Sequence, residues 1–142
     1  LCIRDRREQC RAEADPSHNP ARELARRIDR TFPIVYGTGA LGGVAAMRWK
    51  QSMNENAKAP AYWNQFPELD HNEVCGWGQH GDVTRQVCTL VELRHGLEHA
   101  QLDRRVAVTR DPSQAIPISG SYVGTTADFL GMTVEVAVTA QN

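Results

Sequence analysis

The run from Phe32 to Tyr36 is continuously apolar and leads into a glycine-rich loop, and it constrains the fold more than any other feature. A short apolar run without alternation is typical of a strand that is buried on both faces, as in a parallel sheet covered by helices. A second run of this kind spans residues 87–93. The two runs therefore predict the central strands of a parallel α/β sheet.

The segments around these strands have the features of helices. Asn19 before Pro20 is typical of an N-cap followed by the first helical residue, which predicts a helix through Arg30. Further elements are expected at residues 44–56 (a helix), 97–102 (a short helix) and 106–109 (a third strand). Strands that alternate with helices predict a three-layer α/β/α sandwich with a mainly parallel sheet.

Two segments are harder to assign. Residues 61–77 are aromatic and contain proline, so an irregular segment is expected there. After Asp111 the sequence changes character. Short strands are expected at 116–118 and 134–138, around a loop rich in serine, glycine and threonine and a weak helix.

A chain of 142 residues fits one domain, and we expect a charged extension at residues 1–18 and a single domain at 19–142, with 111–142 divergent. The net charge of −1 gives no electrostatic reason to expect nucleic acid or an anionic membrane as partner. No apolar run approaches the roughly 20 residues of a membrane span. The four cysteines form no Cys-x-x-Cys pair, so we expect free thiols and a cytoplasmic protein.

The loop after the first strand matches the pattern G-x-G-x-x-G, from Gly37 through Gly39 to Gly42. As a dinucleotide fingerprint it needs an acidic residue at the end of the next strand, to bind a ribose hydroxyl. Glu55 stands 18 residues after Gly37, but at the end of a helix with no strand before it. The favoured interpretation is a turn that lets a substrate approach the backbone at Gly37 and Gly39.

The stretch from His95 to His99 spells H-x-x-E-H, an inverted zinc-peptidase pattern. On a helix, the two histidines would share a face, as two zinc ligands must. Gly96 and the preceding strand place His95 at a helix start, and no third ligand is apparent. A solvated helix start is therefore favoured, and we predict no metal site.

The loop at residues 119–126 is rich in hydroxyl groups and glycine. Hydroxyl groups and free backbone N–H groups at a helix N-terminus form a natural phosphate cradle. A merely solvated loop is the plainer interpretation, and the residues alone favour it.

Glu55 and His71 are the candidates for proton transfer. Glu55 closes a helix between Asn54 and Asn56, and His71 lies in a polar loop. Carboxylates and imidazoles can both be tuned toward neutral pH for proton transfer. The residues alone favour a solvated helix end and a locally bonded loop histidine, so the functional interpretation depends on a resemblance.

Two runs of the sequence carry that resemblance. Residues 48–64 contain Asn54-Glu55-Asn56-Ala57-Lys58, and residues 66–77 contain Glu68-Leu69-Asp70-His71-Asn72-Glu73. Both runs resemble the C-terminal half of the bifunctional phosphoglucose/phosphomannose isomerases, which belong to the sugar isomerase (SIS) superfamily. The resemblance extends over about residues 19–110 and implies an SIS fold, here in a truncated form.

The resemblance implies an aldose–ketose isomerase that interconverts glucose 6-phosphate or mannose 6-phosphate with fructose 6-phosphate through an enediolate. The family's catalytic glutamate matches Glu55, beside Asn54 as a substrate-binding residue, and its ring-opening histidine matches His71. Asp70 stands where the family has asparagine. No metal or nucleotide cofactor is implied.

In the family, the active site forms at a dimer interface, so the resemblance implies a homodimer in which Glu55 and His71 serve different sites. The family's first SIS subdomain, with its phosphate loop, has no counterpart in this sequence, so a fragment with doubtful activity of its own is expected. Residues 121–126 resemble that phosphate loop, which would place Ser121 and Thr126 on the substrate phosphate. The alternatives are a sugar-phosphate-binding SIS module without catalysis and a dinucleotide-binding domain.

Overall fold

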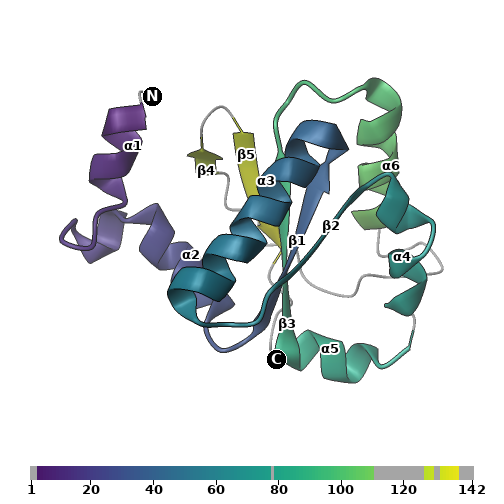
Figure 1. The fold of residues 1–142 in the computed structure, drawn as a ribbon, viewed down its shortest axis with the longest axis horizontal. Helices are drawn as coiled ribbons and strands as arrows, with labels where there is room; N and C mark the ends of the chain where they lie inside the picture. The colour runs from purple at the N-terminus through teal and green to yellow at the C-terminus, as the bar shows by residue number, and fades with distance from the viewer. Residues whose placement is uncertain (1–2, 78, 111–126, 130–131, 138–142) are drawn as a thin grey trace.

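The computed structural model describes residues 3–77, 79–110, 127–129 and 132–137. They form one five-stranded sheet with helices on both faces (Figure 1). The strands are β1 (Phe32–Thr38), β2 (Tyr62–Phe66), β3 (Cys88–Arg94), β4 (Ala127–Phe129) and β5 (Met132–Ala137). The helices are α1 (Ile3–Gln9), α2 (Pro20–Ile28), α3 (Gly39–Ser52), α4 (Glu73–Gly76), α5 (Gly81–Val87) and α6 (Ala100–Arg110), with shorter turns η1 (Pro16–His18), η2 (Met53–Ala57) and η3 (Glu68–Asp70).

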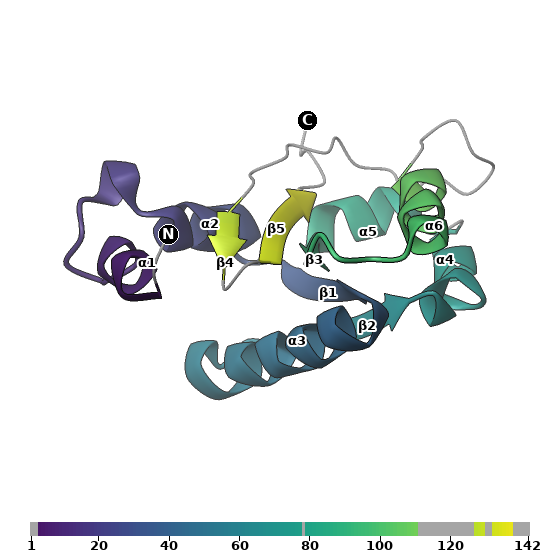
Figure 2. The same cartoon turned by 90° about the horizontal axis from the view of Figure 1, so that it is seen from above.

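The predicted fold class is confirmed. In the strand order β2-β1-β3-β5-β4, β1 pairs parallel with both β2 and β3. The last two strands add on antiparallel. Figure 2 shows α3 on one side of the parallel strands and α5 and α6 on the other, which gives the three layers.

The third parallel strand is not the one that the sequence predicted. Residues 106–109 belong to helix α6, and β2 completes the parallel part of the sheet from within residues 61–77, where an irregular segment was expected. The two valines of 106–109 suggested a strand, but Val106 is fully buried whereas Val108 is 56% exposed. Leu102 and Val106, four residues apart, give α6 a single apolar face, and that face packs on the sheet.

The predicted helices at 20–30, 44–56 and 97–102 overlap α2, α3 and the start of α6, which begins at Ala100, whereas α1, α4 and α5 had no predicted counterpart. The side chain of Asn19 accepts a hydrogen bond from the Arg22 N–H at 3.0 Å, and this cap starts α2, which ends at Ile28. Helix α3 begins at Gly39, before the predicted start at residue 44. The predicted strand at 134–138 overlaps β5, but strand β4 lies where a weak helix was expected, and 116–118 lies outside the described residues.

The core is divided by the sheet into two clusters, because successive strand residues point to opposite faces. Val35, Val91 and Leu93 face Ala46 of α3 and Ile28 of α2. Tyr36 and Leu90 face the other side, with Phe66 and Val106. The central strands are therefore buried on both faces, as their apolar runs predicted.

One charged residue lies within this core. Glu92 of β3 is 1% exposed, and Arg110 at the end of α6 donates to its carboxylate from Nε at 2.6 Å and from a terminal guanidinium nitrogen. This pair fastens the end of α6 to the sheet. None of the helices in the described ranges is both long and apolar enough to cross a membrane.

Candidate functional site

Glu55 lies on a π-helical turn, η2, that continues α3. The amides on either side of it bind the backbone: Asn54 donates to the Ala59 carbonyl at 2.8 Å and Asn56 to the Ser52 carbonyl at 3.0 Å. Lys58, at φ 55°, closes the turn. The turn therefore presents the Glu55 carboxylate to solvent. π-Helical turns of this kind are frequent at functional sites.

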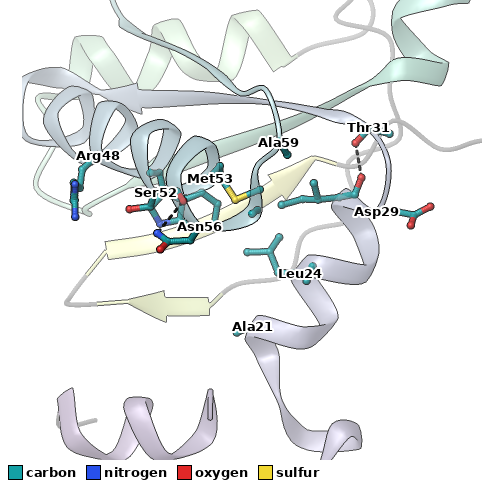
Figure 3. Close-up of a pocket in the computed structure, with 13 residues that line it drawn as sticks. Ala21, Leu24, Asp29, Thr31, Arg48, Ser52, Met53, Asn56 and Ala59 are labelled. Atoms are coloured by element: carbon teal, nitrogen blue, oxygen red, sulfur yellow. Dashed lines mark hydrogen bonds between the residues drawn. The ribbon is translucent and has the colours of Figure 1, made fainter. Parts of the chain in front are cut away.

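A pocket of 670 Å³ lies beside this turn, between α2 and the end of α3 (Figure 3). Leu24 of α2 and Met53 of η2 lie across it from one another, and Arg48 and Asp29 lie toward its two ends. Its volume falls in the range of small-molecule sites. Since Asn56 also lines it, the pocket adjoins the turn that carries Glu55.

His71 follows the short turn η3 and is exposed. The residues before it are fixed to the core. Leu69 is fully buried, and Asp70 accepts a hydrogen bond from the Thr109 hydroxyl of α6 at 2.8 Å. Burial raises the pKa of the Asp70 carboxyl, while the Thr109 hydroxyl and the nearby Arg105 guanidinium oppose that shift.

The structure separates Glu55 from His71. Helix α3 starts at the carboxyl end of β1 and runs back to the other end of the sheet, so η2 and Glu55 precede β2, whereas His71 follows it. The five residues of β2 alone span about 16 Å. Figure 1 shows the end of α3 and helix α4 on opposite sides of the molecule.

The predicted substrate contacts are divided between these two ends. Asn54 lies with Glu55, and Gly37 and Gly39 lie at the carboxyl end of β1. A Cβ on Gly37 would lie 1.9 Å from the Gly42 carbonyl oxygen, so this glycine is needed where α3 packs on β1. Gly39 has φ +64°, which favours glycine. Packing and turn geometry thus account for both glycines, and their contact with substrate stays a prediction.

The H-x-x-E-H stretch forms local capping contacts. The carboxylate of Glu98 accepts from the Arg94 guanidinium at 3.0 Å and from the His95 N–H at 2.9 Å. His99 Nδ1 accepts from the Gln101 N–H at 3.2 Å, in the first turn of α6. Across the described ranges, no three His, Cys, Asp or Glu side chains group as metal ligands would.

Residues 17–115 match the family model for the bacterial phospho-glucose isomerase C-terminal SIS domain. The chain belongs to this family. It is 33% identical over 109 residues to a bifunctional phosphoglucose/phosphomannose isomerase of Caldicellulosiruptor bescii (77% of this chain, 32% of the relative) and 39% identical over 108 residues to that of Aquifex aeolicus (76% and 33%).

The chain is also 47% identical, over a shorter stretch of 51 residues, to a D-glucosamine-6-phosphate 4-epimerase of Sulfolobus acidocaldarius (36% of this chain, 16% of the relative). The chain spans about a third of the length of the two isomerases above. No solved structure matches. Glu55 and His71 lie inside the family match, whereas Ser121 and Thr126 lie beyond it and outside the described residues.

Sequence reasoning missed a polar cluster beside His71 in this SIS domain. Glu73 accepts hydrogen bonds from Tyr36 of β1 and Asn64 of β2, and Trp77 donates to the Tyr36 hydroxyl. One signal was available. Tyr36 is the only residue of the first apolar run with a polar group, and a buried hydroxyl needs a partner.

Proposed function

We propose that this chain supplies the general base and the ring-opening group of a phosphoglucose/phosphomannose isomerase. Glu55 transfers the proton between C2 and C1 of the open-chain sugar phosphate, and His71 exchanges a proton with the ring oxygen. The proposal is supported by family membership and by the bifunctional isomerases among the relatives.

The single observation that carries the proposal is the η2 turn. Both neighbouring amides are bound to the backbone, and Glu55 between them is exposed, on a turn whose residues Asn56 and Ala57 line a pocket. A carboxylate held in this way can take the C2 proton of an aldose, forming an enediolate, and return it to C1 to give the ketose. A proton also passes from O2 to O1 as the enediolate becomes the ketose, so acid–base chemistry alone balances the transfer.

The separation of Glu55 and His71 favours a site built from two copies of the chain. A hexose phosphate is too short to reach both ends of β2. In this proposal, His71 of one copy therefore completes the site that contains Glu55 of the other copy. A C2-symmetric homodimer would contain two such sites. Ser121 and Thr126 stay the predicted phosphate contacts, and a cytoplasmic location stays an expectation.

The test is exchange of the substrate C2 proton with solvent. The purified chain is incubated with glucose 6-phosphate in D₂O, and deuterium at C2 is followed by NMR. We expect exchange above the uncatalysed rate, lost in Glu55→Gln and retained in Glu13→Gln, which removes an exposed carboxylate of the N-terminal region.

Two results would contradict the proposal. Exchange that survives Glu55→Gln would remove Glu55 from its role. If the intact chain binds glucose 6-phosphate but catalyses no exchange, this SIS domain is a binding module. Binding of the substrate phosphate orients the sugar and accounts for much of such catalysis. Even slow exchange of the C2 proton by this chain would therefore support the role of Glu55.

A further inference from the structure

The carboxylate of Glu73 lies where two strands and a helix meet. It accepts the Tyr36 hydroxyl on Oε1 and the Asn64 side-chain amide on Oε2, each at 2.5 Å. Trp77 Nε1 donates to the same Tyr36 oxygen at 2.8 Å. The segment from Glu73 to Trp77 is thus fixed to β1 at two points and to β2 at one.

Only a carboxylate satisfies this arrangement, because both neighbours present donors to it. Tyr36 is fully buried, and burial, followed by the hydrogen bond to Glu73, raises the pKa of its hydroxyl. The hydroxyl therefore stays protonated and donates. Asn64 cannot reverse its amide freely, since its Oδ1 accepts the Gln65 N–H at 2.8 Å.

His71 lies between two such attachments. On its amino side, Asp70 is bonded to Thr109 of α6. On its carboxyl side, Glu73 is bonded to the sheet. The His71 side chain is exposed, and the backbone N–H of His71 donates to the Glu68 carbonyl at 3.0 Å. The exposed histidine is therefore held by its neighbours.

We infer that Glu73 is a positioning residue for His71: by accepting from Tyr36 and Asn64, it fixes the segment that presents the imidazole outward from the end of β2. This role extends the function proposed above. It takes from that function only the ring-opening role of His71. Glu73 touches no reacting atom. Its effect on ring opening passes through the placement of His71.

The test compares Glu73→Gln with a variant that restores the pattern of donors and acceptors. In Glu73→Gln, an NH₂ group faces the Asn64 amide or the Tyr36 hydroxyl, and one bond is lost. In the double variant Asn64→Asp/Glu73→Gln, the side-chain NH₂ introduced at position 73 donates to the new carboxylate at position 64, which can still accept the Gln65 N–H. The control is Glu68→Gln, which removes the charge of an exposed residue on the same segment but keeps an oxygen that can still accept the Asn72 side-chain amide, at 3.4 Å in the wild type.

The first readout is hydrogen exchange of the His71 backbone amide, which is bonded to the Glu68 carbonyl. We expect exchange about tenfold faster in Glu73→Gln, with amides of β3 unchanged, and wild-type exchange in the double variant and in Glu68→Gln. Unchanged exchange at His71 in Glu73→Gln would overturn the inference. So would equal acceleration in β3, or failure of the double variant to restore protection while its β3 amides stay protected.

The second readout is the catalysed interconversion of the α and β anomers of glucose 6-phosphate, which reports ring opening. We expect His71→Ala and Glu73→Gln to slow it and the double variant to restore it. If His71→Ala leaves the rate unchanged, the function proposed for His71 fails, while amide exchange still decides whether Glu73 orders the segment. If His71→Ala slows the rate and Glu73→Gln does not, the positioning role fails.

Discussion

Glu55 and His71 lie at opposite ends of β2, one before the strand and one after it. Each is presented by a turn that the rest of the fold holds in place. The two turns belong to one continuous segment of sequence, yet they face different ends of the sheet. In the function proposed above, a site that uses both residues is therefore built from two copies of the chain.

Complementation between copies tests this arrangement. Glu55→Gln is expected to abolish C2 proton exchange, and His71→Ala to reduce it strongly, because slow ring opening then limits the supply of open-chain sugar. When the two variants are refolded together, about half of the dimers are mixed and each contains one intact site, so about a quarter of wild-type exchange should return. A mixture of Glu55→Gln with the variant that carries both substitutions should recover nothing. Absence of recovery in the first mixture would contradict a shared site.

Gly37→Ala tests the contact between β1 and α3. The added Cβ would lie 1.9 Å from the Gly42 carbonyl oxygen. Relieving this clash would require the backbone of β1 or of α3 to shift, which is energetically costly. We expect the free energy of unfolding in urea to fall by at least about 2 kcal/mol. Gly76→Ala is the control, because its Cβ would meet nothing within 4 Å, and it should leave stability unchanged or raise it by up to about 1 kcal/mol, since alanine favours a helix. Equal effects at the two positions would refute the packing role.

Arg110→Ala tests the buried ion pair. Removing the guanidinium leaves the carboxylate of Glu92, which is 1% exposed, without its main counter-charge. We expect a loss of about 3 kcal/mol in the free energy of unfolding. Arg104→Ala, which changes an exposed residue on the same helix, should cost under about 0.5 kcal/mol. A small effect at Arg110 would show that α6 is held mainly by its apolar face.

Asp70→Asn tests the effect of burial on a carboxyl. The pKa of Asp70 is raised in the folded chain, so the folded state binds the proton more tightly than the unfolded state. The contribution of Asp70 to the free energy of unfolding should therefore fall as the pH rises from about 4, the ordinary value, through the raised pKa. The asparagine variant should lack that decline.

At pH 7 the Asp70→Asn variant should be more stable than wild type by up to about 1 kcal/mol, because the Thr109 bond can remain and a buried charge is removed. Unfolding curves at pH 4 and pH 7 measure both effects. A variant that is less stable than wild type at pH 7 would show that the ion pair with Arg105, at 4.0 Å, outweighs desolvation.

The parts of the fold that the sequence predicted correctly are those with a local physical signal. The apolar runs at β1 and β3 and the cap at Asn19 each specify an element from neighbouring residues. Strand β2 has no such signal, since Tyr62 and Trp63 are exposed at an edge of the parallel strands. The valines near the end of α6 gave a misleading local signal. The preference of valine for strands is weaker than the gain from burying one face of a helix.

For the site, a sequence motif made Glu55 and His71 the candidates, but it did not indicate the groups that hold them in place. The contacts of Asp70 with Thr109 and of Tyr36 with Glu73 join residues 39 and 37 positions apart. Distances of that kind are set by how the helices pack on the sheet. No periodicity along the chain encodes them.

The sequence by itself determined that this chain has parallel strands buried on both faces and that it contains the motifs of an isomerase SIS domain. These properties follow from the types of residue and from their order over short stretches of the chain, which do not depend on contacts between distant segments. Only the tertiary structure decided that β2 separates Glu55 from His71 and that Glu73 binds Tyr36 and Asn64. The reason is that both depend on strand order and on the direction of α3, which are fixed when distant segments bury their apolar faces together.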